Sequence, residues 1–313
     1  VIENFASITH DFLIEKMKKD PTVTYVNAGV PMAAGFVQSK RKELSELRKQ
    51  YVDVGIAEEH ATTFISGMAK NGAKPVFSVI STFLQRTYDQ LSHDLAINNN
   101  PAVILVFGGT LKGMNDITHL GYFDIPLVSN IPNIVYLAPT TKEEYLAMLD
   151  WGIEQNDYPV VIKVPGGAVI HSKTEIDNDY SELNTFKIVE NGENVAIIGL
   201  GEFFELGKEV KTLLKEKSEI NATLINPRYI SGIDEKLLNE LKTNHKVVVT
   251  LESGQKDGGF GQKISAFYGN SDMKVINVGA KKEFTDEIPY DEFFKNNRLT
   301  KEQIVEDILD VLR

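Results

Sequence analysis

The stretch YVDVGIAEEHATTFISGMAKNG, residues 51–72, decides the fold class because a strand pattern runs directly into a helix pattern. Val52, Val54 and Ile56 alternate with small or polar residues, as in a strand. From there the apolar positions recur at the spacing of one helix face: Ala61, Phe64, Ile65 and Met68. Glu58 and Glu59 therefore fall in the turn or the first helical turn. Unpaired N–H groups favour carboxylates at that position, so a structural role alone accounts for both residues.

The same alternation of strand and helix continues along the chain. Strand-like runs lie at 22–29, 51–55, 74–80, 102–109, 133–139 and 159–165. Helical patterns lie at 81–99 and 140–155, and Thr140 with Glu143 has the spacing of a capping box at a helix start. Strands that alternate with helices indicate a parallel sheet covered on both faces.

The polar stretch at 171–186 interrupts this alternation and is interpreted as a linker. After it, strand-like runs return at 194–201, 221–229, 246–253 and 273–279. Helical patterns separate or follow them at 205–218, 234–244, 259–268 and 300–313. We therefore expect an α/β protein of two domains, 1–170 and 187–313, each a mostly parallel sheet flanked by helices.

Composition narrows the classes of function. The 313 residues carry a formal charge of -11, which argues against a nucleic-acid or anionic-membrane surface. With no cysteine, the chain has no disulfide, thiolate nucleophile or cysteine-based zinc site. No apolar run reaches the roughly 18 residues that span a bilayer, and the first residues have no signal-peptide pattern. We expect a cytoplasmic protein.

Polar side chains follow three strand-like runs, where ligands gather in open α/β sheets. Glu58 follows the second run. The next two runs are followed by Ser81, Thr82, Phe83 and Arg86, and by Asn115, Asp116 and His119. Core packing is the ordinary alternative for Phe83, and a surface or capping role for His119. GLGEFF at 199–204 lacks the third glycine of a dinucleotide-binding turn and is interpreted as a tight turn.

Longer blocks resemble one known family. The segments VDVGIAEEHATTFISGMAKNGAKPVFSVISTFLQRTYDQLSHDLAI (52–97), THLGYFDI (118–125) and IPNIVYLAPTTKEE (131–144) closely resemble the pyrimidine-binding domain of 1-deoxy-D-xylulose-5-phosphate synthases, which belong to the thiamine-diphosphate-dependent transketolase superfamily. NPRYISGIDEKLL (226–238) and LESGQKDGGFGQKI (251–264) look like the C-terminal domain of that family. The similarity covers nearly the whole chain.

The resemblance gives the residues of the strand ends a chemical role. In such enzymes the glutamate that matches Glu58 hydrogen-bonds N1′ of the cofactor's aminopyrimidine and promotes the tautomer that deprotonates the thiazolium ring. Phe83 matches the aromatic residue that stacks on the pyrimidine, and Ile56 and Ala57 would form the floor below it. His119 matches a histidine that faces the substrate. By position in the same loops, three more residues are expected near the substrate: Arg86, Asn115 and Asp116.

Two departures from the family concern the cofactor and the substrate. The family holds Mg²⁺ and the diphosphate through a G-D-G motif on a separate domain, and this chain contains no G-D-G. The resemblance therefore implies either a fragment of a longer synthase or a small subunit completed by a diphosphate-binding partner, in a homodimer or a larger assembly. Glycines stand at two positions where the family has phosphate-binding arginines, Gly108 and Gly166, and Asn115 replaces an aspartate.

Three functions follow from the resemblance. The first is a synthase-like enzyme component that uses pyruvate and glyceraldehyde 3-phosphate. Lys112 or Lys163 could replace the charge of the missing arginines, but not their geometry. The second is a transketolase-like small subunit that acts on another sugar or sugar phosphate. The third is a non-catalytic interaction subunit, which would be indicated by loss of Glu58 or Phe83. Both residues are present.

Overall fold

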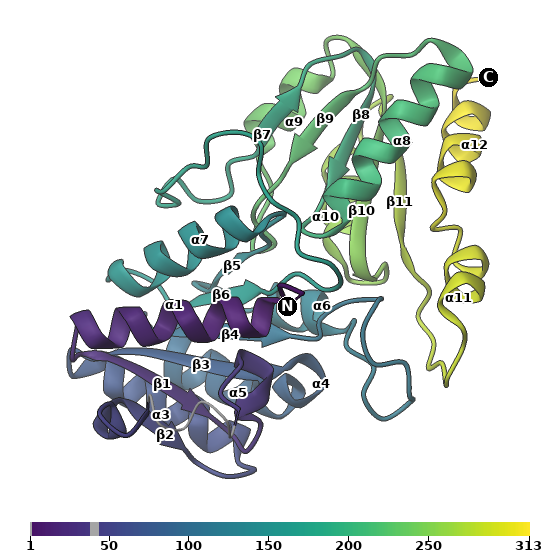
Figure 1. Ribbon diagram of the computed structural model, residues 1–313. Helices are drawn as coiled ribbons and strands as arrows, with labels where there is room; N and C mark the ends of the chain where they lie inside the picture. The colour runs from purple at the N-terminus through teal and green to yellow at the C-terminus, as the bar shows by residue number, and fades with distance from the viewer. Residues whose placement is uncertain (1, 38–43) are drawn as a thin grey trace.

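The computed structural model describes residues 2–37 and 44–313 and contains two β-sheets with helices on both faces (Figure 1). In the described residues the first sheet has six strands in the order β2-β1-β3-β4-β6-β5. All five neighbouring pairs are parallel. The strands are β1 (Val23–Asn27), β2 (Tyr51–Asp53), β3 (Lys74–Ile80), β4 (Val103–Phe107), β5 (Val135–Leu137) and β6 (Val160–Lys163). These match the six predicted runs.

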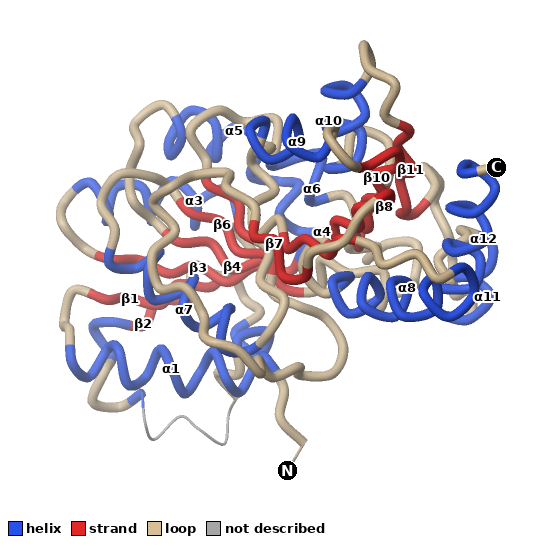
Figure 2. The backbone as a smooth tube through the Cα atoms, turned by 90° about the horizontal axis from the view of Figure 1, so that it is seen from above, coloured by secondary structure: helices blue, strands red, loops and turns tan. Residues whose placement is uncertain are grey.

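Two groups of helices cover the faces of this sheet. Helices α1 (Phe5–Lys19) and α7 (Lys142–Glu154) lie on one face, and α3 (Glu58–Lys70) and α6 (Asp124–Val128) on the other (Figure 2). Shorter segments complete the first half: turns of 3₁₀-helix at Pro31–Ala34, Arg48–Gln50 and Gln85–Thr87, helices α4 (Ser81–Leu84) and α5 (Tyr88–Gln90), and a π-helix at Leu91–Ala96. The expected α/β layers are thus confirmed.

The second sheet has the order β11-β10-β8-β9-β7, and only the β7–β9 pair is antiparallel in the part of the chain that the structure describes. Its strands are β7 (Lys187–Glu190), β8 (Asn194–Gly199), β9 (Thr223–Asn226), β10 (His245–Gln255) and β11 (Lys274–Ala280). Its helices are α8 (Phe203–Ser218), α9 (Glu235–Leu241), α10 (Phe260–Tyr268), α11 (Tyr290–Asn296) and α12 (Lys301–Leu312). Helices α8 and α12 pack on one face, and α9 and α10 on the other.

Two local predictions are wrong in detail. The pattern at 81–99 predicts a helix, but the chain changes between α-, 3₁₀- and π-helical turns there. The Thr87 hydroxyl donates to the carbonyl of Leu84 at 2.7 Å, and such bonds compete with regular helix bonding. The capping box of α7 lies one residue later than predicted: Thr141 caps the N–H of Glu144, and the Glu144 carboxylate accepts the N–H of Thr140.

Four α-helices and strands of the described residues lie outside the predicted runs: α1, α6, β7 and α11. Strand β7 is a mostly exposed edge strand, so it lacks the buried apolar run from which the other strands are predicted. Residues 171–186 form no helix or strand, as expected of a linker, but they are not detached from the fold. Tyr180 is buried, and its carbonyl accepts the hydroxyl of Tyr229 at 2.8 Å. The domain boundaries drawn from the sequence stay a prediction.

The two sheets meet at the edge strand β5. Leu137 forms an antiparallel bridge with Tyr229, and two main-chain bonds of 2.7 Å flank it, from Ala138 N–H to the carbonyl of Arg228 and from Ile230 N–H to the carbonyl of Tyr136. These contacts tie the edge of the first sheet to the segment that follows β9.

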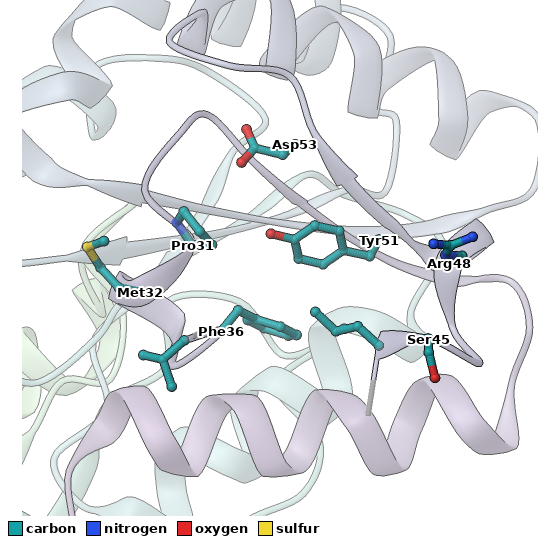
Figure 3. Close-up of a pocket in the computed structure, with 9 residues that line it drawn as sticks. Pro31, Met32, Phe36, Ser45, Arg48, Tyr51 and Asp53 are labelled. Carbon is teal, nitrogen blue, oxygen red and sulfur yellow. The ribbon is translucent and has the colours of Figure 1, made fainter. Parts of the chain in front are cut away.

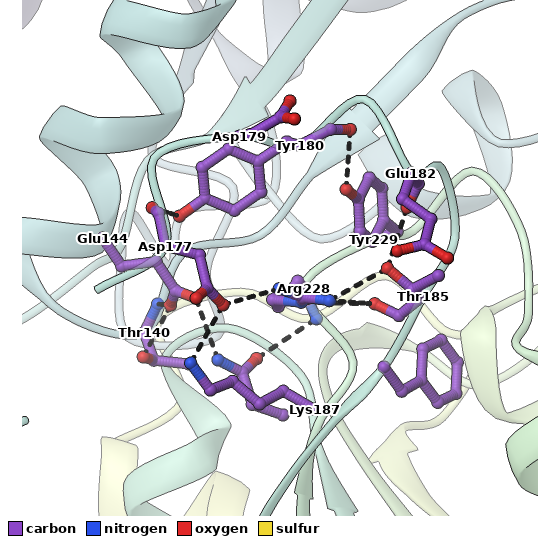
Figure 4. Close-up of polar contacts among 12 residues, drawn as sticks. Thr140, Glu144, Asp177, Asp179, Tyr180, Glu182, Thr185, Lys187, Arg228 and Tyr229 are labelled. Atoms are coloured by element: carbon purple, nitrogen blue, oxygen red, sulfur yellow. Dashed lines mark hydrogen bonds and ion pairs between the residues drawn. The ribbon is translucent and has the colours of Figure 1, made fainter. Parts of the chain in front are cut away.

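Side chains reinforce the junction (Figure 4). The Arg228 guanidinium donates to Asp177 at 3.0 Å and to the carbonyl of Thr185 at 2.8 Å. Asn226 donates to the buried Glu144 carboxylate at 2.9 Å. Residues 171–186, the predicted linker, thus pack into the contact between the two sheets.

Candidate active site

Glu58 lies where the opening stretch of sequence places it, as the first residue of α3. Its residue exposure is only 2%. Ala57 is the N-cap and has no capping side chain, so the carboxylate stands at the positive end of the helix. The side chain is therefore a buried acid at the carboxyl edge of a parallel sheet.

Arg86 is the partner of Glu58. Its Nη1 donates to Glu58 Oε2 at 3.0 Å, while the arginine side chain itself is 53% exposed. Within the described part of the chain, no group donates a hydrogen bond to the other oxygen, Oε1. The carboxylate thus has one anchored oxygen and one that is available to a ligand.

Phe83 and His119 meet above the ends of β3 and β4. Their ring centroids are 5.7 Å apart at an interplanar angle of 80°. Ser81 ties the two strand ends together, since its hydroxyl donates to the carbonyl of Gly121 at 2.9 Å. The structure therefore brings Glu58, Arg86, Phe83 and His119 to one edge of the sheet, although the roles implied for them stay predictions.

The remaining predicted residues are Ile56 and Ala57, expected at the cofactor, and Asn115 and Asp116, expected near the substrate. Ile56 is 80% exposed next to the partly buried Ala57, so the expected floor is open on one side. Asp116 Oδ1 contacts Nδ1 of His119 at 2.9 Å, and the hydroxyl of Thr118 and then His119 lower the pKa of Asp116. Asn115 points elsewhere: its amide nitrogen lies 3.4 Å from the carbonyl of Ile288 in the second domain.

A carboxylate that was not predicted from the sequence lies beside Gly166. Glu202, in the turn before α8, accepts the N–H of Gly166 at 2.7 Å and the hydroxyls of Thr110 and Ser253. A Cβ atom at position 166 would lie 2.7 Å from Thr110 and 2.8 Å from Glu202. The only sequence signal for Glu202 is its place within GLGEFF, for which the sequence predicts a tight turn.

Lys163 does not supply the charge expected of it. Its ammonium is buried and donates to both oxygens of Asp124, at 2.9 and 2.7 Å, and the hydroxyl of Tyr136 donates to the same carboxylate. Lys163 is thus neutralised inside the protein. Lys112 remains exposed, with its ammonium 5.8 Å from the centroid of the Tyr290 ring.

Glu252 is a second buried acid behind this edge. Its carboxylate accepts the N–H groups of Phe260 and Gly261, at 2.8 and 2.9 Å, at the start of α10. Burial raises its pKa to about 7 against the lowering effect of these bonds and of the Lys163 charge.

A cavity of about 730 Å³ lies beside β2, with Met32, Phe36 and Tyr51 in its wall (Figure 3). Asp53, at one end, accepts the N–H groups of Gly29 and Gly55 at 3.0 and 2.9 Å and so fixes the turn that leads to Glu58. The wall includes Val37 and Leu44, and the structure does not describe the residues between them, so we assign the cavity no ligand.

The described residues offer no other obvious class of site. Among residues 2–37 and 44–313, no group of three or more His, Asp or Glu side chains could hold a metal ion. No described helix has both the length and the apolar character needed to cross a membrane.

Comparison with known sequences identifies two domains. The transketolase pyrimidine-binding domain matches residues 4–169, and the transketolase C-terminal domain matches residues 184–304. Similar curated proteins include the 1-deoxy-D-xylulose-5-phosphate synthases of Clostridium tetani and Vibrio campbellii, each 34% identical. The alignments cover 96% and 99% of this chain and 48% of each relative. The chain therefore spans about half the length of these relatives.

Solved structures share the fold. A split-gene transketolase, described as an inactive β4 tetramer, superposes with a TM-score of 0.80 at 19% identity and covers 100% of this chain and 99% of its own. A transketolase from Pichia stipitis in complex with sedoheptulose 7-phosphate gives a TM-score of 0.78 at 15% identity, covering 100% of this chain and 46% of its own.

Glu252 makes stability depend on pH. Because its pKa is raised from 4.5 to about 7, the folded chain binds this proton more tightly than the unfolded chain does. This group should therefore lower the unfolding free energy, by roughly 2–4 kcal/mol, as pH rises from about 4.5 to about 7. In Glu252→Gln that decline should largely disappear in urea titrations at several pH values. The exposed Glu240→Gln serves as the control, and equal pH slopes in all three proteins would contradict the assignment.

Proposed function

The chain belongs to the transketolase family, since it carries that family's pyrimidine-binding and C-terminal domains, and on this premise we propose that it is a component of a thiamine-diphosphate-dependent transferase that forms carbon–carbon bonds. The single observation that carries the proposal is the buried Glu58 carboxylate with one oxygen held by Arg86, at the same edge of the sheet as the Phe83–His119 pair.

The residues present fit the aminopyrimidine half of the cofactor thiamine diphosphate. When bound, thiamine diphosphate supplies the carbon nucleophile that makes or breaks a bond next to a carbonyl group. Glu58 Oε1 is an acceptor without a partner among the described residues, and it suits a protonated ring nitrogen. Phe83 offers an aromatic face at the next loop, and His119 is the group we assign to the substrate. Glu58 would hold the proton at N1′, while Arg86 keeps its carboxylate in place.

For the diphosphate half of the cofactor and its Mg²⁺ ion, the described residues offer no binding site. Mg²⁺ prefers oxygen ligands, and no cluster of acidic residues in the described ranges could hold it. We therefore propose that a diphosphate-binding domain or subunit completes the site, in a homodimer or larger assembly. The relatives are about twice as long as this chain, which supports such a partner. The cytoplasmic location expected from the sequence stays a prediction.

Pyruvate and glyceraldehyde 3-phosphate are the proposed substrates by similarity to the named synthases. The environment of Gly166 favours the alternative of a different acceptor, because Glu202 places a carboxylate where a phosphate-binding cation is expected. The alternative of a non-catalytic interaction subunit has less support, since both Glu58 and Phe83 are retained at the sheet edge.

Glu58→Gln tests the catalytic proposal. The amide keeps the shape of the helix start but removes the carboxylate that shares the N1′ proton, so the proton-transfer step should slow by roughly 10²–10⁴-fold. The measurement is deuterium exchange at C2 of thiamine diphosphate in the enzyme reconstituted with its diphosphate-binding partner. Glu59→Gln, at an exposed neighbour, should have little effect. Exchange as fast in Glu58→Gln as in the wild type would show that Glu58 serves only the helix start.

The 313-residue chain alone should bind thiamine diphosphate weakly or not at all, because the metal and diphosphate contacts are expected from the partner. Isothermal calorimetry with and without Mg²⁺ measures this directly. Tight Mg²⁺-dependent binding by the chain alone would contradict the need for a partner.

Glyceraldehyde 3-phosphate should be a poor acceptor for the reconstituted enzyme compared with a full-length synthase. Two charge-assisted contacts to phosphate, each of roughly 1.5–3 kcal/mol, are missing at Gly108 and Gly166. The value of kcat/KM with this acceptor should therefore be reduced, and unphosphorylated glyceraldehyde is the matched comparison. A strong preference for the phosphorylated acceptor, with the efficiency of an ordinary synthase, would refute this prediction.

A further inference from the structure

The second domain reaches over to the loop that carries His119. Its segment 281–289 follows β11, and Glu287 N–H donates to the carbonyl of Asn115 at 2.8 Å. Asp286 Oδ1 accepts the N–H of Ile117 at 3.1 Å. The amide of Asn115 donates to the carbonyl of Ile288 at 3.4 Å. Three hydrogen bonds thus join residues 286–288 to residues 115–117, all in exposed segments at the carboxyl edge of the first sheet.

The segment that makes these bonds is itself anchored. The hydroxyl of the buried Tyr122 contacts the carbonyl of Glu283 at 3.3 Å and the hydroxyl of Thr285 at 3.2 Å. At its start, Lys281 N–H donates to Asn297 at 2.8 Å, and Asn297 is buried. Hydrogen bonds to buried residues therefore hold segment 281–289 in place, so that it can support the 115–119 loop.

The contacts continue from Ile117 to the imidazole. Asp116 Oδ1 accepts the hydroxyl of Thr118 at 2.6 Å and lies 2.9 Å from Nδ1 of His119. The N–H of His119 donates to the carbonyl of Asp116 at 3.0 Å. Among the described residues of the first sheet, the Thr82 hydroxyl donates to the carbonyl of Thr118, but this bond is long, at 3.4 Å. Residues 286–288 of the second domain thus add three hydrogen bonds to the local contacts that orient this loop.

We propose that Asp286 is a positioning residue, which holds the 115–119 loop so that the imidazole of His119 stays edge-on against Phe83. A carboxylate that accepts a backbone N–H forms a charge-assisted bond, stronger than the neutral bonds beside it. The role of Asp286 in turnover rests on the proposed function, whereas its role in placing His119 does not. The C-terminal domain would in this way shape the substrate side of a site whose acid, Glu58, lies in the first domain.

The direct test uses the chain by itself. Selective ¹³C labelling gives ring signals for the six histidines, and His119→Ala assigns the relevant one. In wild type the His119 ring protons should carry a ring-current shift from Phe83, which Phe83→Leu removes. Asp286→Ala should move this signal toward its position in Phe83→Leu and raise amide exchange at Ile117 at least tenfold. Asp286→Asn keeps an acceptor oxygen and should restore both readouts.

Two further variants keep the test decisive. Asn115→Asp places a carboxylate against the Ile288 carbonyl and should shift the His119 signal in the same direction, even if Asp286→Ala proves unstable. Asp272→Ala, an exposed acid in the loop between α10 and β11, is the control and should change neither readout. A His119 signal that is unchanged in Asp286→Ala and Asn115→Asp would overturn the proposal.

Turnover separates this proposal from the proposed function. In the reconstituted enzyme, Asp286→Ala should lower kcat three- to thirtyfold and leave the KM for thiamine diphosphate unchanged, with recovery in Asp286→Asn. If the wild-type assembly has no activity, the proposed function fails while the spectroscopic test still decides the role of Asp286. An active enzyme with wild-type kcat in Asp286→Ala would overturn the role of Asp286 in positioning a substrate-facing histidine.

Discussion

The arrangement of the whole chain depends on the main-chain bridge between β5 and residues 228–230. An edge strand presents unpaired N–H and C=O groups, and here Tyr136 and Ala138 find their partners in the second domain. Two polar contacts reinforce this bridge, from Asn226 to Glu144 and from Arg228 to Asp177. Because Glu144 and Arg228 are buried, moving the sheets apart would leave buried polar groups without partners, and this favours one placement of the second domain over the first sheet.

This constraint explains why the candidate site draws residues from both domains. The first sheet presents Glu58, Phe83 and His119 at its carboxyl edge, while the second domain adds Glu202 beside Gly166 and Asp286 beside Ile117. The added groups are both acidic. The part of the edge near β4 and β6 therefore differs in charge from what a phosphate-binding pocket needs, whereas the surroundings of Glu58 keep a cation, Arg86.

Local pattern was sufficient for the parallel strands, because strands buried on both faces appear as apolar runs, as 103–107 and 160–163 do, but it was not sufficient for the exposed antiparallel edge strand β7. It was also sufficient for the place of Glu58, which follows from one strand and one helix. The partners of these residues could not be predicted in the same way. Arg86 pairs with an acid 28 positions away, Lys163 with one 39 positions away, and Asp286 with an amide 169 positions away. Such contacts are set by how the sheets pack, which no local spacing records.

The apolar core on one face of the molecule does not stop at the boundary between the sheets. Ile65 of α3, Tyr136 of β5, Ile225 of β9 and Phe260 of α10 belong to a single buried cluster. Removing either half would leave the other with an uncovered apolar surface along the junction, and recombination within residues 171–186 would join surfaces that have not adapted to each other. The two domains thus share one apolar core, and the junction between them is a poor place to cut the chain.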